Sequence, residues 1–308
     1  MIELLWADPA SAAIVAGLFG LLVGSFLNVV ILRLPARMEW QFRQDARETL
    51  GMPPAYEPAP PGLAIERSHC PHCGHKLSWY ENIPLFSFAV LRGKCRSCAA
   101  RISWQYPFVE ALTALLFAAC AWKFRGYIEC LLALYFSCSL VVLAGIDIRT
   151  TLLPDDITQP LLWTGLLASL LAVFAYPLEA WFGPSALSDP AALWPSPVSA
   201  LFGAVAGYLS FWCVARLFKL IRNVEAMGAG DFKLLAALGA WCGLGSLLGI
   251  VLLSSLVGAI VGGAWLLLRG KDSSTQIPFG PYLAIAGWLQ FYFQFDLFAL
   301  LLRWSMPG

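Results

Sequence analysis

Apolar runs of about 20 residues recur along this 308-residue chain. That is the length an α-helix needs to cross the hydrocarbon core of a bilayer. The composition agrees, because only 13% of the residues are charged, against about 25% in an ordinary soluble domain. No strand-period alternation is long enough for a barrel. We therefore expect an all-α polytopic membrane protein. Its eight spans are expected at residues 10–32, 107–122, 127–146, 157–176, 195–215, 232–247, 249–268 and 281–302.

The first apolar run is expected to be a retained span and not a signal peptide. Residues 1–9 contain no Lys or Arg, so the positive region that begins a signal peptide is missing. With the N-terminus outside, all of the 20 Lys and Arg residues except Lys123, Arg125 and Arg303 fall on the cytoplasmic side. This distribution satisfies the positive-inside rule. It predicts an extracytoplasmic N-terminus and a loop at 177–196 on the same outer face.

Three regions are expected along the chain: a first span at 1–33, a hydrophilic insertion at 34–105 and a bundle of about seven spans at 106–308. The insertion begins with a charged, helix-prone stretch, 36–50, and a proline-rich connector, 53–61. It then carries two cysteine pairs.

The cysteine pairs have the spacing of a zinc ribbon. Cys70 and Cys73 form one CxxC, and Cys95 and Cys98 form another after 21 intervening residues. Four thiolates complete a closed tetrahedral Zn²⁺ site, which is structural because it leaves no open position. Disulfides are the alternative, and the expected cytoplasmic location disfavours them. The three histidines, all beside the first pair, are expected to be exposed neighbours and not ligands.

Two aspartates stand at the expected cytoplasmic border of the bundle. Asp147 ends the third span, and Asp231 opens the sixth within Gly-Ala-Gly-Asp-Phe-Lys. A charge in a span is costly, so each one indicates a function. Two neighbouring carboxylates share a proton, so that one activates water and the other acts as the acid. Gly228 and Gly230 leave room for an extended substrate backbone, and we assign Lys233 to the same substrate-binding set.

Structural roles for these carboxylates stay open at this point. Asp147 has Arg149 as a possible ion-pair partner, and Asp231 could cap its helix. Asp155 and Asp156 directly precede an apolar span, and capping of that helix explains them better than catalysis does.

The motifs together resemble those of the type IV prepilin peptidases over nearly the whole chain. The residues that carry the resemblance are Gly24–Pro35, the two CxxC pairs with Glu81–Pro84 between them, Ile146-Asp147 with Leu153–Asp155, Gly228–Lys233 and Pro278–Pro281. The Gly228–Lys233 stretch is the GxGD motif, which is weak evidence alone but specific in this order.

The resemblance implies an aspartyl protease of the bacterial inner membrane with Asp147 and Asp231 as its catalytic dyad. Such enzymes cleave the leaders of type IV prepilins and type II secretion pseudopilins on the cytoplasmic side. Members with four cysteines usually also methylate the new N-terminus from S-adenosylmethionine, and this activity rests on the resemblance alone. The partners implied are these substrates and the lipid bilayer, and no nucleic acid is expected.

Three competing functions remain: a protease without methyltransferase activity, a transporter or channel, and a zinc-bearing scaffold. A transporter would favour charges near the bilayer midplane, whereas Asp147 and Asp231 are expected at its edge.

Overall fold

The computed structural model describes residues 8–53, 56–63, 66–171, 173–174, 194–223, 227–269 and 278–295. The regular elements of this part are helices, with two isolated β-bridges. The chain divides into two compact units, Met1–Lys123 and Phe124–Gly308. The loop expected at 177–196 lies almost entirely outside the described residues.

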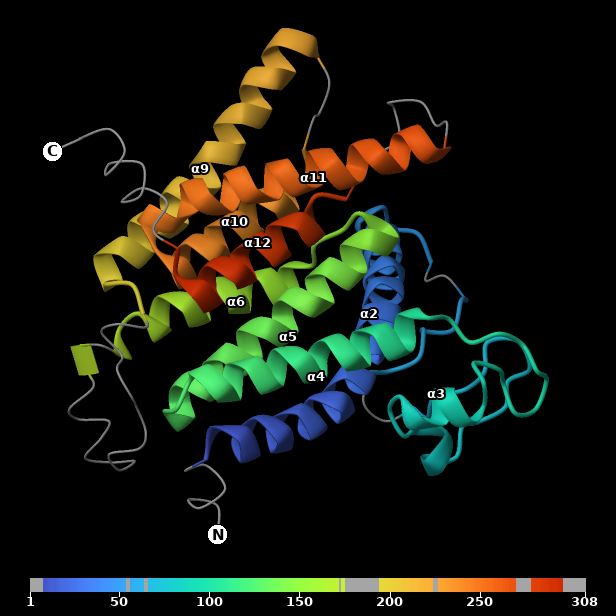
Figure 1. Ribbon diagram of the computed structural model, residues 1–308. Coiled ribbons are helices and arrows are strands. Elements are labelled where there is room, and N and C mark those ends of the chain that lie inside the picture. The colour runs from blue at the N-terminus through green and yellow to red at the C-terminus, as the bar shows by residue number, and fades with distance from the viewer. Residues whose placement is uncertain are drawn as a thin grey trace, which may run out of the picture. The chain divides into compact units, whose positions relative to one another are not determined.

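The first unit is built on two long helices, α2 (Pro9–Thr49) and α4 (Gln105–Lys123). Two glycines on α2 allow the backbones to approach closely, since a β-carbon on Gly20 would lie 2.9 Å from the Ala114 Cα, and one on Gly24 would lie 2.8 Å from the Glu110 Cα. The helix α2 does not stop at the membrane border but continues through the charged stretch. It contains Pro35, and Figure 1 shows it bending between its two halves, as an internal proline explains.

The second half of α2 holds the proline-rich connector through side-chain donors on one helix face. Arg33, Arg37 and Trp40 are spaced so that they project from the same side. Arg33 donates to the backbone carbonyls of Gly62 and Glu66. Arg37 donates to the carbonyl of Pro60, and Trp40 donates to that of Glu57. The connector therefore runs back along the helix toward the cysteine pairs. Two short helices, η1 (Trp79–Asn82) and α3 (Phe86–Val90), separate those pairs.

The second unit is a helical bundle around α10 (Ala229–Cys242). Figure 1 shows α10 among its packing partners. Residues 234–241 of α10 are all buried. The other elements are α5 (Tyr127–Thr150), α6 (Asp155–Ala168), α9 (Pro197–Arg222), η2 (Leu244–Ser246), α11 (Leu247–Arg269) and α12 (Gly280–Phe293).

The contact between α9 and α10 is made backbone to backbone. A β-carbon on Gly203 would lie 2.4 Å from the Gly239 carbonyl oxygen, and one on Gly239 would lie 2.2 Å from the Gly203 carbonyl oxygen. Any side chain at either position would force the helices apart. This crossing holds α10, the helix that carries Asp231, deep in the bundle.

Each of the eight expected spans overlaps a helix of the described residues, but the ends of those expected at 157–176 and 281–302 lie outside that part, and only part of the expected span count is supported. Within the described residues, four helical segments are long and apolar enough to cross a membrane: Pro9–Thr49, Tyr127–Thr150, Pro197–Arg222 and Leu244–Ala264. The helices α6, α10 and α12 have 14 residues each, or about 21 Å. That is shorter than the roughly 30 Å hydrocarbon core.

Candidate active site and metal centre

Asp147 lies in the last turn of α5 with its carboxylate buried, at 4% exposure. Its Oδ2 accepts a hydrogen bond of 2.8 Å from the backbone N–H of Gly280, the first residue of α12. A helix N-terminus carries partial positive charge and unpaired N–H groups, so it suits a carboxylate. The start of α12 therefore holds the Asp147 side chain in place.

Asp231 lies in the first turn of α10 and is half-buried. The N-cap residue is Gly228, so Asp231 is the third residue of the helix and not its cap. Its carboxylate interacts electrostatically with that of Asp147. The structure thus brings together the two aspartates predicted from the sequence, Asp147 at the end of α5 and Asp231 at the start of α10.

Leu153 fills the space between the two glycine-containing helix starts. A β-carbon on Gly230 would lie 2.7 Å from the Leu153 Cβ, and one on Gly280 would lie 3.2 Å from the Leu153 Cδ2. Among the described residues, a β-carbon on Gly228 would meet only the Asp231 Oδ2, at 3.9 Å. Gly230 thus makes room for Leu153, whereas Gly228 is exposed and open on its outer side.

The capping role expected for Asp155 and Asp156 is wrong. The N-cap of α6 is Pro154, and no side chain of the described residues forms a capping hydrogen bond with this helix. Asp155 instead forms an ion pair with Lys233, whose Nζ lies 2.7 Å from both of its carboxylate oxygens. Lys233 was expected to bind substrate, but its ammonium group donates to a carboxylate on the neighbouring helix α6.

Sequence reasoning missed the contacts that surround the dyad. The segment 278–281 was noticed as a motif, but its role as a donor to Asp147 was not inferred. Leu153 and the Asp155–Lys233 pair were not assigned either. The glycine in Pro-Phe-Gly-Pro was the available signal, because a glycine beside a proline at a helix start suggests a close approach.

The four cysteines expected to bind metal gather at one point of the first unit. Their sulfur atoms all lie within 4.8 Å of one another. The Cys70 and Cys98 sulfurs are 3.8 Å apart, and those of Cys73 and Cys95 are 4.0 Å apart. Tetrahedral zinc with Zn–S bonds of about 2.3 Å requires sulfurs about 3.8 Å apart. The donor set and its spacing therefore fit a four-thiolate metal site.

Each CxxC pair forms the same tight knuckle. The N–H of Gly74 donates to the Cys70 carbonyl, and the N–H of Ala99 donates to the Cys95 carbonyl. Both donors have positive φ, 68° and 56°. Within the knuckles, backbone N–H groups of Cys73 and His72 lower the pKa of the Cys70 thiol to about 7. The N–H groups of Cys98 and Ser97 lower the pKa of Cys95 in the same way. Such N–H groups favour the thiolate that a metal requires.

The histidines beside the first pair do not complete the cluster. His69 and His72 are exposed, and the His75 Nε2 lies 3.2 Å from the Glu81 carboxylate. Glu81 also accepts from the backbone N–H of Ser78 at 2.8 Å. That N–H is the chief cause of its lowered pKa, with His75 contributing. The His75–Glu81 pair stabilises the start of η1, which lies between the two knuckles in the sequence.

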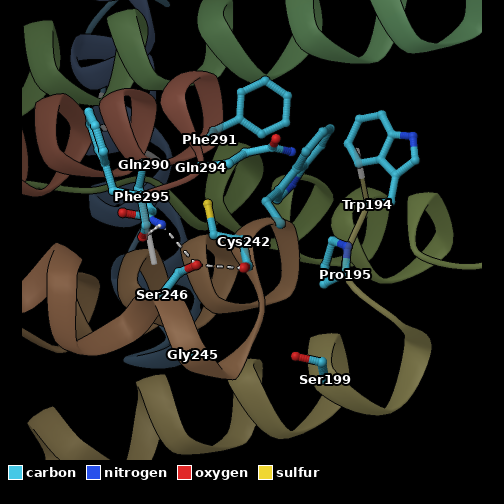
Figure 2. Close-up of a pocket in the computed structure, with 11 residues that line it drawn as sticks. Trp194, Pro195, Ser199, Cys242, Gly245, Ser246, Gln290, Phe291, Gln294 and Phe295 are labelled. Atoms are coloured by element: carbon cyan, nitrogen blue, oxygen red, sulfur yellow. Dashed lines mark hydrogen bonds between the residues drawn. The ribbon is translucent and has the colours of Figure 1, made fainter. Parts of the chain in front are cut away.

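A separate cavity of about 340 Å³ lies at the C-terminal end of α10, away from Asp231. Figure 2 shows its aromatic walls, with the Gln290 amide donating to Ser246. It is lined by Trp194, Pro195, Ser199, Trp241, Cys242, Gly245, Ser246, Gln290, Phe291, Gln294 and Phe295. The described residues of this lining include no Asp, Glu, His, Lys or Arg, so they offer no carboxylate or imidazole for acid–base hydrolysis.

Comparison with known proteins covers both units. The family model described as the bacterial peptidase A24 N-terminal domain matches residues 18–124. The model of the type IV leader peptidase family matches residues 134–263. No solved structure gives a significant match.

Curated relatives match at high identity and nearly full length. A protein of Xanthomonas campestris pv. campestris is 53% identical over 96% of this chain and 95% of its own length. One from Pseudomonas aeruginosa is 47% identical over 94% of this chain and 93% of its own length. One from Aeromonas hydrophila is 48% identical over 88% of this chain and 87% of its own length. Each is named prepilin leader peptidase/N-methyltransferase. The chain therefore belongs to the type IV leader peptidase family.

Proposed function

We propose that this protein cleaves the leader peptides of type IV prepilins and type II secretion pseudopilins, and then methylates the new N-terminus. The observation that carries the proteolytic half is that the carboxylates of Asp147 and Asp231, at two helix ends, are near enough for their charges to interact. The name shared by the relatives, prepilin leader peptidase/N-methyltransferase, supports both halves.

The proposed hydrolysis needs only the two carboxylates and one water molecule. The ionised carboxylate takes a proton from water while the oxygen adds to the scissile carbonyl carbon. The protonated carboxyl donates its proton to the carbonyl oxygen, and the leaving amine is protonated as the C–N bond breaks. The Gly280 N–H keeps Asp147 oriented throughout.

We place the substrate backbone beside Gly228. This residue is exposed and precedes Asp231 by three positions, so an extended chain can approach the dyad from that side. Gly230 contributes by admitting Leu153, which packs beneath the site. A direct contact between Lys233 and substrate is the alternative to its ion pair with Asp155, and the KM of a Lys233 variant distinguishes the two.

We propose that the cysteine cluster holds one structural Zn²⁺. Zinc bound by Cys70, Cys73, Cys95 and Cys98 would stabilise the two knuckles and offer no open position for substrate. Methylation transfers the methyl group of S-adenosylmethionine to the new terminal amine, and the donor is a second substrate. The sequence contains no glycine-rich dinucleotide fingerprint.

We propose eight spans in the bacterial inner membrane, with the N-terminus outside and both the cysteine cluster and the dyad at the cytoplasmic face. The distribution of Lys and Arg supports this orientation. The hydrogen bond between Asp147, just after the span expected at 127–146, and Gly280, just before the span expected at 281–302, supports placing those two span ends on one face.

The test is cleavage of a prepilin-like peptide by the purified protein in detergent, with and without S-adenosylmethionine. We expect leader removal in both cases and N-terminal methylation only with the donor. Asp147→Asn and Asp231→Asn should each abolish cleavage, since neither amide can exchange the proton. Asp156→Asn is the matched control and should cleave normally. Cleavage retained by either folded dyad variant would remove that residue from the dyad, and no cleavage by the wild type would refute the function.

A further inference from the structure

The Asp155–Lys233 ion pair joins α10, which carries Asp231, to the start of α6, the helix that follows Asp147 along the chain. Lys233 lies on α10, two residues after Asp231, and Asp155 is the first residue of α6, eight positions after Asp147. The Lys233 Nζ is 2.7 Å from each carboxylate oxygen. A single side-chain contact therefore links the helix of one aspartate to the short connection that follows the other.

The position of Lys233 on α10 connects its ion pair to the orientation of the Asp231 side chain. Successive residues of an α-helix are rotated by about 100°, so Asp231 and Lys233 project from nearly opposite sides of α10. When Asp155 holds the ammonium group, rotation of α10 about its own axis is restricted. Such a rotation would swing the Asp231 carboxylate away from Asp147.

The other side of the pair is anchored through Leu153. This residue lies between Asp147 and Asp155 in the sequence, and its side chain occupies the space left by Gly230 and Gly280. Asp155 is therefore attached to a connection that packs against the starts of both α10 and α12. Farther along, the Trp241 indole N–H donates to the Leu161 carbonyl at 2.8 Å. Two side-chain contacts therefore connect α6 and α10: the Trp241–Leu161 hydrogen bond and the Asp155–Lys233 ion pair, which is the one beside the dyad.

The ion pair is too exposed to contribute much to the stability of the fold. The side chains of Lys233 and Asp155 are 29% and 56% exposed, and such pairs are weak. Small energies nevertheless change the population of a correctly aligned site several-fold. The expected consequence of losing this pair is a less aligned dyad in a folded protein.

We propose that Asp155 and Lys233 are positioning residues, which together hold the Asp231 carboxylate in register with Asp147. This inference rests on the proposed proteolytic function. Neither side chain reacts with the substrate. They act by fixing the rotation of α10 against the connection from α5.

The experiment is a double-mutant cycle on peptide cleavage, with kcat and KM measured for each variant. Asp155→Asn and Lys233→Met should each lower kcat about fivefold to tenfold, with KM nearly unchanged. The double variant should be no worse than either single one, because both remove the same contact. Lys233→Arg should retain most of kcat, since a guanidinium can also hold a carboxylate at two points. Asp156→Asn, which changes the neighbouring carboxylate, should match the wild type.

The outcomes separate this inference from the proposed function. A wild type that does not cleave overturns the function itself. A wild type that cleaves while Asp155→Asn behaves like Asp156→Asn overturns the positioning role. A raised KM in Lys233→Met alone, additive with Asp155→Asn, would make Lys233 a substrate contact and refute the inference. Thermal unfolding of each variant checks the fold, and a loss of kcat matched by an equal fall in folded protein would refute positioning as well.

Discussion

Replacing Gly280 with alanine tests whether the start of α12 orients Asp147. A β-carbon at this position would lie 2.7 Å from the Asp147 Oδ2. The backbone of Gly280 is not in the left-handed region, so alanine is compatible with the local conformation. The substitution therefore acts on the aspartate and leaves the helix able to form.

The expected loss of activity follows from the displacement. Ordinary contact begins at 3.4 Å, so the carboxylate oxygen must move by about 0.7 Å. That movement lengthens or breaks its 2.8 Å hydrogen bond to the Gly280 N–H. A hydrogen bond to a charged group contributes about 1.5–3 kcal/mol, and each 1.36 kcal/mol corresponds to about tenfold in rate. We expect kcat to fall about 10- to 100-fold.

The assay is leader removal from a prepilin-like peptide, followed by gel shift and normalised to folded protein. Gly263→Ala is the matched control, because a β-carbon there would have no neighbour within 4 Å in the part of the chain that the structure describes. Both variants should unfold near the wild-type temperature, since alanine is favoured over glycine in helices. If Gly280→Ala cleaves as fast as Gly263→Ala, the start of α12 does not orient the catalytic carboxylate.

Two further predictions concern the metal site and the packing of α10. Protein purified without added metal should contain about one zinc per chain, and Ser replacement of Cys70 and Cys73 should lower methylation more than cleavage, because carboxylate hydrolysis needs no metal. Elemental analysis and mass spectrometry of the cleaved product measure both, and normal methylation in a variant that fails to cleave would contradict this division. Gly239→Leu should destabilise the bundle by about 1–3 kcal/mol or more, since its side chain would meet the Gly203 backbone. Gly263→Leu should change little, and equal thermal inactivation of these two variants would refute the packing argument.

The sequence alone determined the features that depend on local pattern. The apolar runs gave the positions of helices because hydrophobic length is a property of a continuous segment. The two CxxC pairs predicted one four-cysteine cluster because a two-residue spacer brings both sulfurs of a pair to one side. The charged stretch after the first span was expected to be helical, but its continuity with that span through Pro35 was not. A proline usually ends or kinks a helix, and sequence does not say which.

The tertiary structure alone decided which groups surround the dyad. Gly280 follows Asp147 by 133 positions, and no local pattern relates the two. Asp155 was interpreted as a helix cap because it directly precedes an apolar span, yet its partner, Lys233, lies 78 positions away. Side-chain partners at such separations depend on how helices pack and rotate against one another. Those geometries follow from the fit of whole surfaces, such as the glycine contact between α9 and α10, and not from the residues on either side of an aspartate.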